Sequence, residues 1–157
     1  MRLFQGEVQP DRAVRLDVAV LAGNAGSVRQ RIEHLGVVAD VFFVTLNKAD
    51  KDYSPTTMYN DYSINESLFH WQSQSTTAEN SPTGQRYIHH KERGSKVLLF
   101  VREFKADCMT GGAEAYTYLG TANYMKHTGS RPMNITWQLD RPIPAKFLKK
   151  TNKLVVG

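Results

Sequence analysis

Asp40–Asn47, with the sequence DVFFVTLN, is a near-continuous run of β-branched and aromatic residues. A short run of this kind, followed by polar residues, is typical of a strand that is buried on both faces. Similar or alternating patterns predict further strands along the chain, at Leu68–Gln74, Arg86–His90, Lys96–Phe104, Tyr116–Lys126 and Asn134–Leu139. The sequence therefore predicts five or six short strands.

Turns that contain glycine and proline separate these strands, and one clear helix signal precedes them. Ser27–Gly36 has apolar residues at helical spacing, with Ser27 as N-cap and Gly36 as C-cap. Gly120 lies inside a predicted strand, which indicates a β-bulge or a close approach to the backbone. We expect a mainly β fold with a few helices (α+β), namely a small, partly closed β-barrel with one or two helices against it.

The chain of 157 residues has the length of a single domain. We divide it into an N-terminal extension that carries the helix (residues 1–39), a β-barrel (40–148) and a basic tail (149–157). The polar segment Ser75–Gln85 is longer than a tight hairpin needs, so it is a candidate functional loop.

Composition narrows the class of protein. Hydrophobic residues make up 41% of the chain, and no apolar run approaches the roughly 20 residues of a membrane span. The N-terminus lacks the pattern of a secretory signal, and the single cysteine, Cys108, allows neither an intramolecular disulfide nor a cysteine-based zinc site. We therefore expect a cytoplasmic protein with no membrane segment.

Charge is distributed unevenly along the chain. Residues 1–80 carry seven Lys and Arg against ten Asp and Glu, whereas residues 81–157 carry thirteen against five. A basic half of this size suits a polyanionic partner, although solvated basic surfaces also occur on proteins that bind no nucleic acid. The candidates for contacts with a nucleic-acid backbone are Arg86, Lys91, Arg93, Lys126 and Arg131. For Arg102 we expect a structural pairing with an acidic residue.

Tyr53–Gln74 (YSPTTMYNDYSINESLFHWQSQ) crowds aromatic rings among amides, hydroxyls and carboxylates. Proteins use this combination on unstacked nucleobases, because rings stack on the base while polar groups read its edge. The alternative is that these aromatics fill a β-rich core, as most large aromatics do. Within Leu68–Gln74, alternation places Phe69, Trp71 and Ser73 on one face of a strand and Leu68, His70, Gln72 and Gln74 on the other.

Motifs for metal, phosphate or nuclease chemistry are missing from the sequence. His89 and His90 are adjacent, so on a strand they point to opposite faces and cannot share a metal ion. Neither GxxxxGK[ST] nor GxGxxG occurs, and the acidic residues show no recognisable spacing. We expect no metal, no cofactor and no catalytic activity.

Six blocks follow one another between Asp40 and Leu148: FVTLNKADKDYSPTTMYNDYSI, LFHWQSQSTT, SPTGQRYIHH, VLLFVRE, YTYLG and GSRPMNITWQL. In this order they resemble the C-terminal domain of unknown function of superfamily II helicases from restriction-type systems, which is often joined to a phospholipase D-like nuclease. Residues 1–39 lie outside the resemblance. The resemblance implies a PUA-like β-barrel related to the SET- and RING-associated domain.

Some members of that family belong to modification-dependent restriction enzymes that cut DNA carrying 5-methylcytosine. The resemblance therefore implies a DNA-binding module that recognises 5-methylcytosine or 5-hydroxymethylcytosine by base flipping, as the specificity domain of such a system. Its partners would be double-stranded DNA with a modified cytosine, and helicase and phospholipase D-like nuclease domains in cis or in trans.

Related base-flipping readers hold the methylated cytosine between two aromatic rings while a carboxylate accepts from its amine. Their motifs do not align with this chain, so we nominate residues from chemistry and position: Asp61 for the amine, Tyr59, Tyr62 and Trp71 for stacking, and Ser73, Gln74 and Tyr118 as further contacts. Tyr118 or Tyr124 can replace one of the stacking rings.

Two other functions are consistent with the same residues. A protein-interaction or structural domain that couples helicase to nuclease would need no positive charge and would keep its aromatics in the core. A PUA-like RNA-binding module would use the basic half in the same way as a DNA reader.

Overall fold

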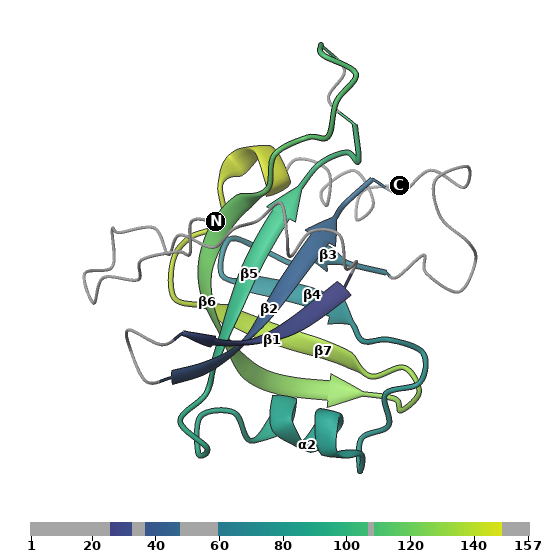
Figure 1. The fold of residues 1–157 in the computed structure, drawn as a ribbon, viewed down its shortest axis with the longest axis vertical. Helices are drawn as coiled ribbons and strands as arrows, with labels where there is room; N and C mark the ends of the chain where they lie inside the picture. Colours follow the sequence, from purple (N-terminus) through teal and green to yellow (C-terminus); the bar gives the residue numbers. More distant parts are fainter. Residues whose placement is uncertain (1–25, 33–36, 48–59, 107–108, 149–157) are drawn as a thin grey trace.

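A computed structural model describes residues 26–32, 37–47, 60–106 and 109–148, and in this part the chain is mainly β (Figure 1). One seven-stranded sheet has the order β1-β2-β5-β6-β7-β4-β3. Its strands are β1 (Gly26–Ile32), β2 (Val37–Thr45), β3 (Tyr62–Ser63), β4 (Leu68–Gln72), β5 (Lys96–Arg102), β6 (Thr117–Thr128) and β7 (Asn134–Leu139), and the helix α2 spans Pro82–Ile88.

The sheet curls because β6 belongs to both of its halves. The first part of β6 pairs with β5 and its second part, from Ala122 onward, pairs with β7, so the long strand carries the sheet around a corner (Figure 1). All neighbouring pairs are antiparallel except β2 and β5. Since β1 and β3 stand at opposite ends of the order, the sheet remains a half-barrel. The predicted mainly β, partly closed barrel is confirmed.

Gly120 sits at the bend of β6. The register between β5 and β6 shifts between Leu99 and Phe100, and Gly120 has a φ of 104°, which side chains other than hydrogen rarely tolerate. A Cβ on Gly120 would lie 3.0 Å from Nε of Arg141. Both sequence expectations for this glycine, a bulge and a close approach, are confirmed.

Aromatic rings fill the interior of the half-barrel. Phe42 of β2 stacks on Trp71 of β4 with ring centroids 4.0 Å apart, and it meets Tyr87 of α2 and Trp137 of β7 edge-on at 5.5 and 5.4 Å. Stacked and edge-to-face pairs of this kind add to the stabilisation from burial alone. Helix α2 lies at the lower end of the sheet (Figure 1). Its Tyr87 side chain belongs to this interior core.

Strand β2 is buried on both faces, as its sequence predicts. Phe42 and Val44 belong to the interior core, whereas Val41 and Phe43 belong to a second apolar cluster on the other face, together with Phe100 of β5. Strands β4, β5, β6 and β7 also lie where the patterns predict them, within a few residues.

Two secondary-structure predictions are wrong. The stretch predicted as the start of a helix, from Ser27 onward, forms β1 instead, because residues 26–32 pair along their whole length with β2. Arg86–His90, predicted as a strand, belongs to α2 and the turn after it. The Ser81 side chain accepts from the backbone N–H of Gly84 and Pro82 follows it, which are the signals of a helix N-terminus.

These corrections also change the predicted boundaries. Strand β1 and the start of β2 lie within residues 1–39, so the sheet begins earlier than the predicted limit at residue 40. The end of the candidate loop Ser75–Gln85 forms the first turn of α2. Among the described residues, no helix is long and apolar enough to cross a membrane.

Candidate functional site

The sequence-predicted aromatic segment lies at the edge of the sheet, where β3 pairs with β4. Tyr62 stacks on His70 with centroids 4.5 Å apart and planes 10° from parallel. The Asp61 carboxylate accepts from the backbone N–H of Gln72 at 2.9 Å, and the His70 ring donates through Nδ1 to the carbonyl of Asn60 at 2.8 Å. The structure thus places Asp61 and Tyr62 against β4, where Asp61 contacts Gln72 and Tyr62 contacts His70. We name Asp61, Tyr62, His70 and Gln72 the edge strip.

Trp71 and Ser73 point the opposite way, into the interior. Trp71 is 4% exposed and its ring face is covered by Phe42. Ser73 is fully buried, and its hydroxyl accepts from the backbone N–H of Met133 at 2.9 Å. The alternation predicted for β4 is correct, and the face with Trp71 is the core face. In this structure a base cannot stack on Trp71 without displacing Phe42.

The remaining base-binding candidates are scattered. Gln74 is exposed in the turn after β4, and Tyr59 lies outside the described residues. Tyr118 packs on Phe100 at 4.9 Å beneath the guanidinium of Arg141, and burial raises the pKa of its phenol to about 12 in spite of that cation. Tyr118 therefore does not belong to the edge strip. It packs against the second apolar cluster.

Arg86 is committed to an ion pair. Its guanidinium donates three hydrogen bonds of 2.9–3.2 Å to Asp40 of β2, whose side chain is 1% exposed. Burial lowers the pKa of Arg86, but the hydrogen bonds and charge of Asp40 outweigh this and leave it raised. This bidentate pair ties α2 to the sheet and gives Arg86 a structural role. Its contact with a nucleic-acid backbone stays a prediction.

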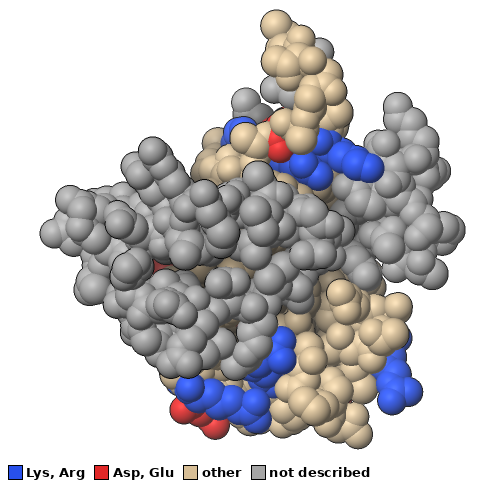
Figure 2. Space-filling view, viewed as in Figure 1, with Lys and Arg blue, Asp and Glu red and all other residues tan. Residues whose placement is uncertain are grey.

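The other predicted cations are exposed. Lys91 and Arg93 lie on the turn between α2 and β5, Lys126 lies near the end of β6, and Arg131 lies before β7. Within the described part of the chain, none of the four forms an ion pair. Figure 2 shows basic side chains gathered at the lower edge of the molecule, over the turn after α2, with acidic atoms beside them. We name residues 89–96 the basic turn.

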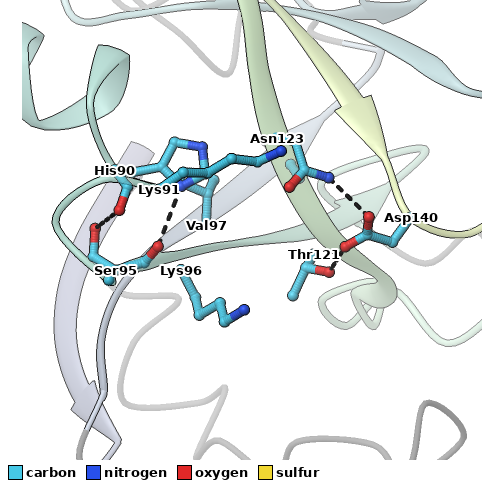
Figure 3. A pocket seen from close by; sticks show the side chains of 10 residues that line it. His90, Lys91, Ser95, Lys96, Val97, Thr121, Asn123 and Asp140 are labelled. Atoms are coloured by element: carbon cyan, nitrogen blue, oxygen red, sulfur yellow. Dashed lines mark hydrogen bonds between the residues drawn. The ribbon is translucent and has the colours of Figure 1, made fainter.

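A pocket of about 280 Å³ opens between the basic turn and β6 (Figure 3). Lys91 and Lys96 line it on the side of the turn, and both side chains extend toward β6 (Figure 3). Thr121 and Asn123 of β6, with Asp140 just after β7, line the other side. The pocket therefore has two ammonium groups on one side and oxygen acceptors on the other.

The acceptor side is held rigid by its own hydrogen bonds. Asp140 accepts from the Thr121 hydroxyl and, at 2.8 Å, from Nδ2 of Asn123. Asn123 Nδ2 also donates to the carbonyl of Gln138 at 3.1 Å. We name Thr121, Asn123 and Asp140 the acceptor wall.

His90 forms the inner end of the pocket and is the reason the basic turn has a fixed shape. Its Nδ1 donates to the carbonyl of Ser95 at 3.2 Å, and its Nε2 accepts from the backbone N–H of Tyr124 at 3.0 Å, next to the bulge in β6. Burial is the main cause that lowers the pKa of His90, so the ring is neutral at pH 7. With both nitrogens engaged, His90 has no lone pair left for a metal ion or a proton.

The remaining histidines form local contacts. His89 faces Glu92 at 3.3 Å, and His127 accepts from the Tyr124 hydroxyl at 2.6 Å while its other nitrogen lies 3.5 Å from Glu79. No group of three or more His, Cys, Asp or Glu side chains able to hold a metal is found among the residues described.

Sequence reasoning missed Lys96 and the whole acceptor wall. The sequence predicts Lys96 only as the first residue of a strand. Thr121, Asn123 and Asp140 come from a strand and a turn with no motif spacing between them. The one available signal was the pair of polar residues, Thr121 and Asn123, on alternate positions of a strand otherwise rich in aromatics.

The comparison with known proteins agrees with the extent of this fold. No curated protein matches the chain. Residues 15–150 match the family described as a domain of unknown function (DUF3427), so the match begins well before Asp40, where the resemblance in the sequence starts. Because the match covers most of the 157 residues, the chain belongs to the DUF3427 family of domains of unknown function.

Proposed function

We propose that this protein is a non-catalytic DNA-binding module that recognises a modified cytosine, 5-methylcytosine or 5-hydroxymethylcytosine, as the specificity domain of a modification-dependent restriction system. The observation that carries the proposal is the basic turn, where Lys91, Arg93 and Lys96 are exposed beside a pocket with a hydrogen-bonding wall. The helicase and phospholipase D-like nuclease partners follow from the resemblance of the sequence blocks alone.

Electrostatics supports a polyanionic partner. Each phosphate neutralised by a lysine or arginine releases condensed counterions, which makes such contacts a source of affinity without sequence preference. Three exposed cations within six residues, opposed in sequence only by Glu92, give the basic turn a net positive charge. Phosphates bound at this turn would position the duplex, and the adjoining pocket would supply recognition of the base.

The shape of the module supports base flipping. Proteins that examine every edge of a base extrude it from the stack into a pocket, where hydrogen bonds and stacking read it. Lys91 and Lys96 line the pocket and are exposed, so a nucleotide extruded from a duplex on that turn has a short path into it.

Fluorescence anisotropy on labelled oligonucleotides tests the proposal. Four duplexes of one sequence carry 5-methylcytosine, 5-hydroxymethylcytosine, unmodified cytosine or an abasic site, and a single-stranded DNA and an RNA hairpin complete the set. We expect the duplex with a modified cytosine to bind most tightly, with affinity falling steeply as salt rises. Equal affinity for modified and unmodified duplexes would contradict recognition of the modification, and preference for the hairpin would favour an RNA-binding module.

Charge variants locate the interface. Lys91→Gln and Arg93→Gln should each weaken binding to modified and unmodified DNA alike and reduce the salt slope by about one. Lys146→Gln is the matched control, because Lys146 is also an exposed lysine but lies on residues 145–148, at the opposite end of the molecule from the basic turn (Figure 1). If the control weakens binding as much as Lys91→Gln, the duplex does not lie on the basic turn.

A further inference from the structure

We propose that the pocket between the basic turn and β6 binds a single nucleotide whose base carries an exocyclic amine, with its phosphate on Lys91 and Lys96 and its amine on Asp140 and Asn123. This deepens the proposed function, on which it rests, by naming the groups of the pocket that hold the phosphate of the nucleotide and read its base. The sequence alone assigns no role to Asn123, Asp140 or Lys96.

The two sides of the pocket differ in what they can bind. Lys91 and Lys96 are exposed, and in the described residues neither forms an ion pair, so their ammonium groups remain able to take a phosphate. The acceptor wall on the opposite side offers oxygens. A ligand that satisfies both sides carries an anion at one end and an N–H donor at the other, and a nucleotide with an exocyclic amine has this arrangement.

The orientation of Asn123 follows from its hydrogen bonds. Its amide nitrogen has two hydrogens, and these go to Asp140 and to the carbonyl of Gln138. The amide oxygen is therefore the group that Asn123 presents on the side of Lys91, as Figure 3 shows. Because the amide cannot flip without losing two bonds, the wall presents an acceptor and excludes a donor at this position.

Asp140 strengthens the same selectivity. Each of its carboxylate oxygens receives one hydrogen bond from the wall and retains capacity for a second. An amine of cytosine placed against Asn123 and Asp140 donates to one or both. A carbonyl at the same ring position, as in thymine or uracil, would set oxygen against oxygen, so the wall favours cytosine over its deaminated counterparts.

The other sides of the pocket are compatible with a base. Val97 and Ala122 also line the pocket, and His90 is neutral with both nitrogens engaged. The carbonyl of Ser95 accepts from that ring and so helps to hold the turn in place. The basic turn and the wall thus keep their shape without a ligand.

The sharpest test uses 5-methyl-2′-deoxycytidine 5′-monophosphate and thymidine 5′-monophosphate, which share the 5-methyl group and the phosphate. They differ in amine against carbonyl at position 4, and in N3, which is an acceptor in the first and an N–H donor in the second. Each is titrated into the ¹⁵N-labelled protein, and the backbone resonances of residues 91–97 and 121–123 and the Asn123 side-chain amide are followed by NMR. We expect the amine-bearing nucleotide to shift these resonances and to bind roughly tenfold more tightly than its counterpart. Equal affinity, or shifts confined to Tyr62 and His70 or to Tyr118, would overturn the proposal.

Variants separate the two sides of the pocket. Lys91→Gln and Lys96→Gln, both at exposed positions, should lower the affinity for the two nucleotides by the same factor, because both nucleotides carry the phosphate. Asp140→Asn should lower the affinity for the amine-bearing nucleotide alone. The difference in affinity between the two nucleotides should therefore become smaller. Its fold is checked by thermal unfolding. If Asp140→Asn is unstable, Asn123→Leu serves instead, and a full preference for the amine in a folded Asn123→Leu protein would also overturn the proposal.

Duplex binding distinguishes the failure of this proposal from failure of the proposed function. If the wild-type protein prefers duplexes with modified cytosine and Asp140→Asn keeps that preference, the proposed function stands and the pocket is not its reader. If the nucleotides bind the pocket with the expected preference but no duplex binds, the pocket stands as a nucleotide site and DNA recognition fails.

Discussion

The edge strip and the pocket beside the basic turn contrast in how their polar groups are used. In the edge strip, Asp61 and Gln72 bond to each other through carboxylate and backbone, and Tyr62 already stacks on His70. In the pocket, the exposed side chains of Lys91 and Lys96 extend toward β6, and Asn123 of the acceptor wall presents its amide oxygen on the side of Lys91. The contrast teaches that residue types alone are a poor sign of a binding site. Polar groups whose hydrogen-bonding capacity the fold leaves unused are a better one.

Trp71→Ala should produce the largest effect of any change near the edge strip. Truncating a fully packed tryptophan removes its burial and leaves a cavity against Phe42, which costs about 3–5 kcal/mol of unfolding free energy. Urea denaturation measures it, with Trp71→Phe as the milder control. A loss below about 1 kcal/mol would mean that the ring is not a core residue and would restore it as a candidate for stacking on a base.

Arg86→Met should come next, because it removes the guanidinium that donates three hydrogen bonds to the buried Asp40 carboxylate. Breaking a buried pair on one side costs about 3–5 kcal/mol, and the one-fifth exposure of the Arg86 side chain places the expected loss at the lower end, about 3 kcal/mol. The double variant Asp40→Leu, Arg86→Met should recover most of it. Chemical denaturation of the three proteins tests this: a double variant as unstable as the sum of both singles would show that the pair does not act as a unit.

The local pattern predicts much of the fold because the relevant signals lie within one element. Asp40–Asn47 indicates a doubly buried strand, the alternation of Leu68–Gln74 separates its two faces, and Gly120 indicates a bulge, and all three agree with the structure. The local pattern gives the wrong prediction for residues 26–32. Their apolar spacing fits a helix, and only the long-range pairing with β2 makes them a strand.

The site was harder to predict because its members are distant in sequence. Nothing near Arg86 reveals that Asp40, 46 positions earlier, will take its guanidinium. Lys91, Asn123 and Asp140 come together only because β6 bends past the basic turn and β7 ends beside it. An aromatic-rich segment draws attention in a sequence, yet rings such as Trp71 are more often used by the core.

His90 makes the stability of the pocket region depend on pH. Burial lowers its folded-state pKa below the unfolded value of about 6.5, so the unfolded chain binds a proton that the folded protein does not. Stability is therefore fully present above about pH 6.5 and falls as the pH drops toward the folded pKa, by at most about 1.4 kcal/mol per pH unit from this residue. Denaturation at pH 7.5, 6.5 and 5.5 measures the slope. His90→Gln should lower the stability at every pH and flatten the slope of stability against pH. An unchanged slope would mean that the other histidines cause the pH dependence.

Tyr62→Leu should have the smallest effect and decides most directly between the two regions. The substitution removes the stack on His70 while keeping an apolar side chain at the half-buried sheet edge, so it should cost about 0.5–1.5 kcal/mol of stability. Because the edge strip is satisfied by its own contacts, the preference for DNA with a modified cytosine over plain DNA should not change. Anisotropy on the two duplexes, beside Asp140→Asn as the comparison, gives the measurement. Should Tyr62→Leu remove the preference while Asp140→Asn keeps it, the base is read at the sheet edge, and Tyr62 regains the stacking role that its sequence neighbourhood predicts.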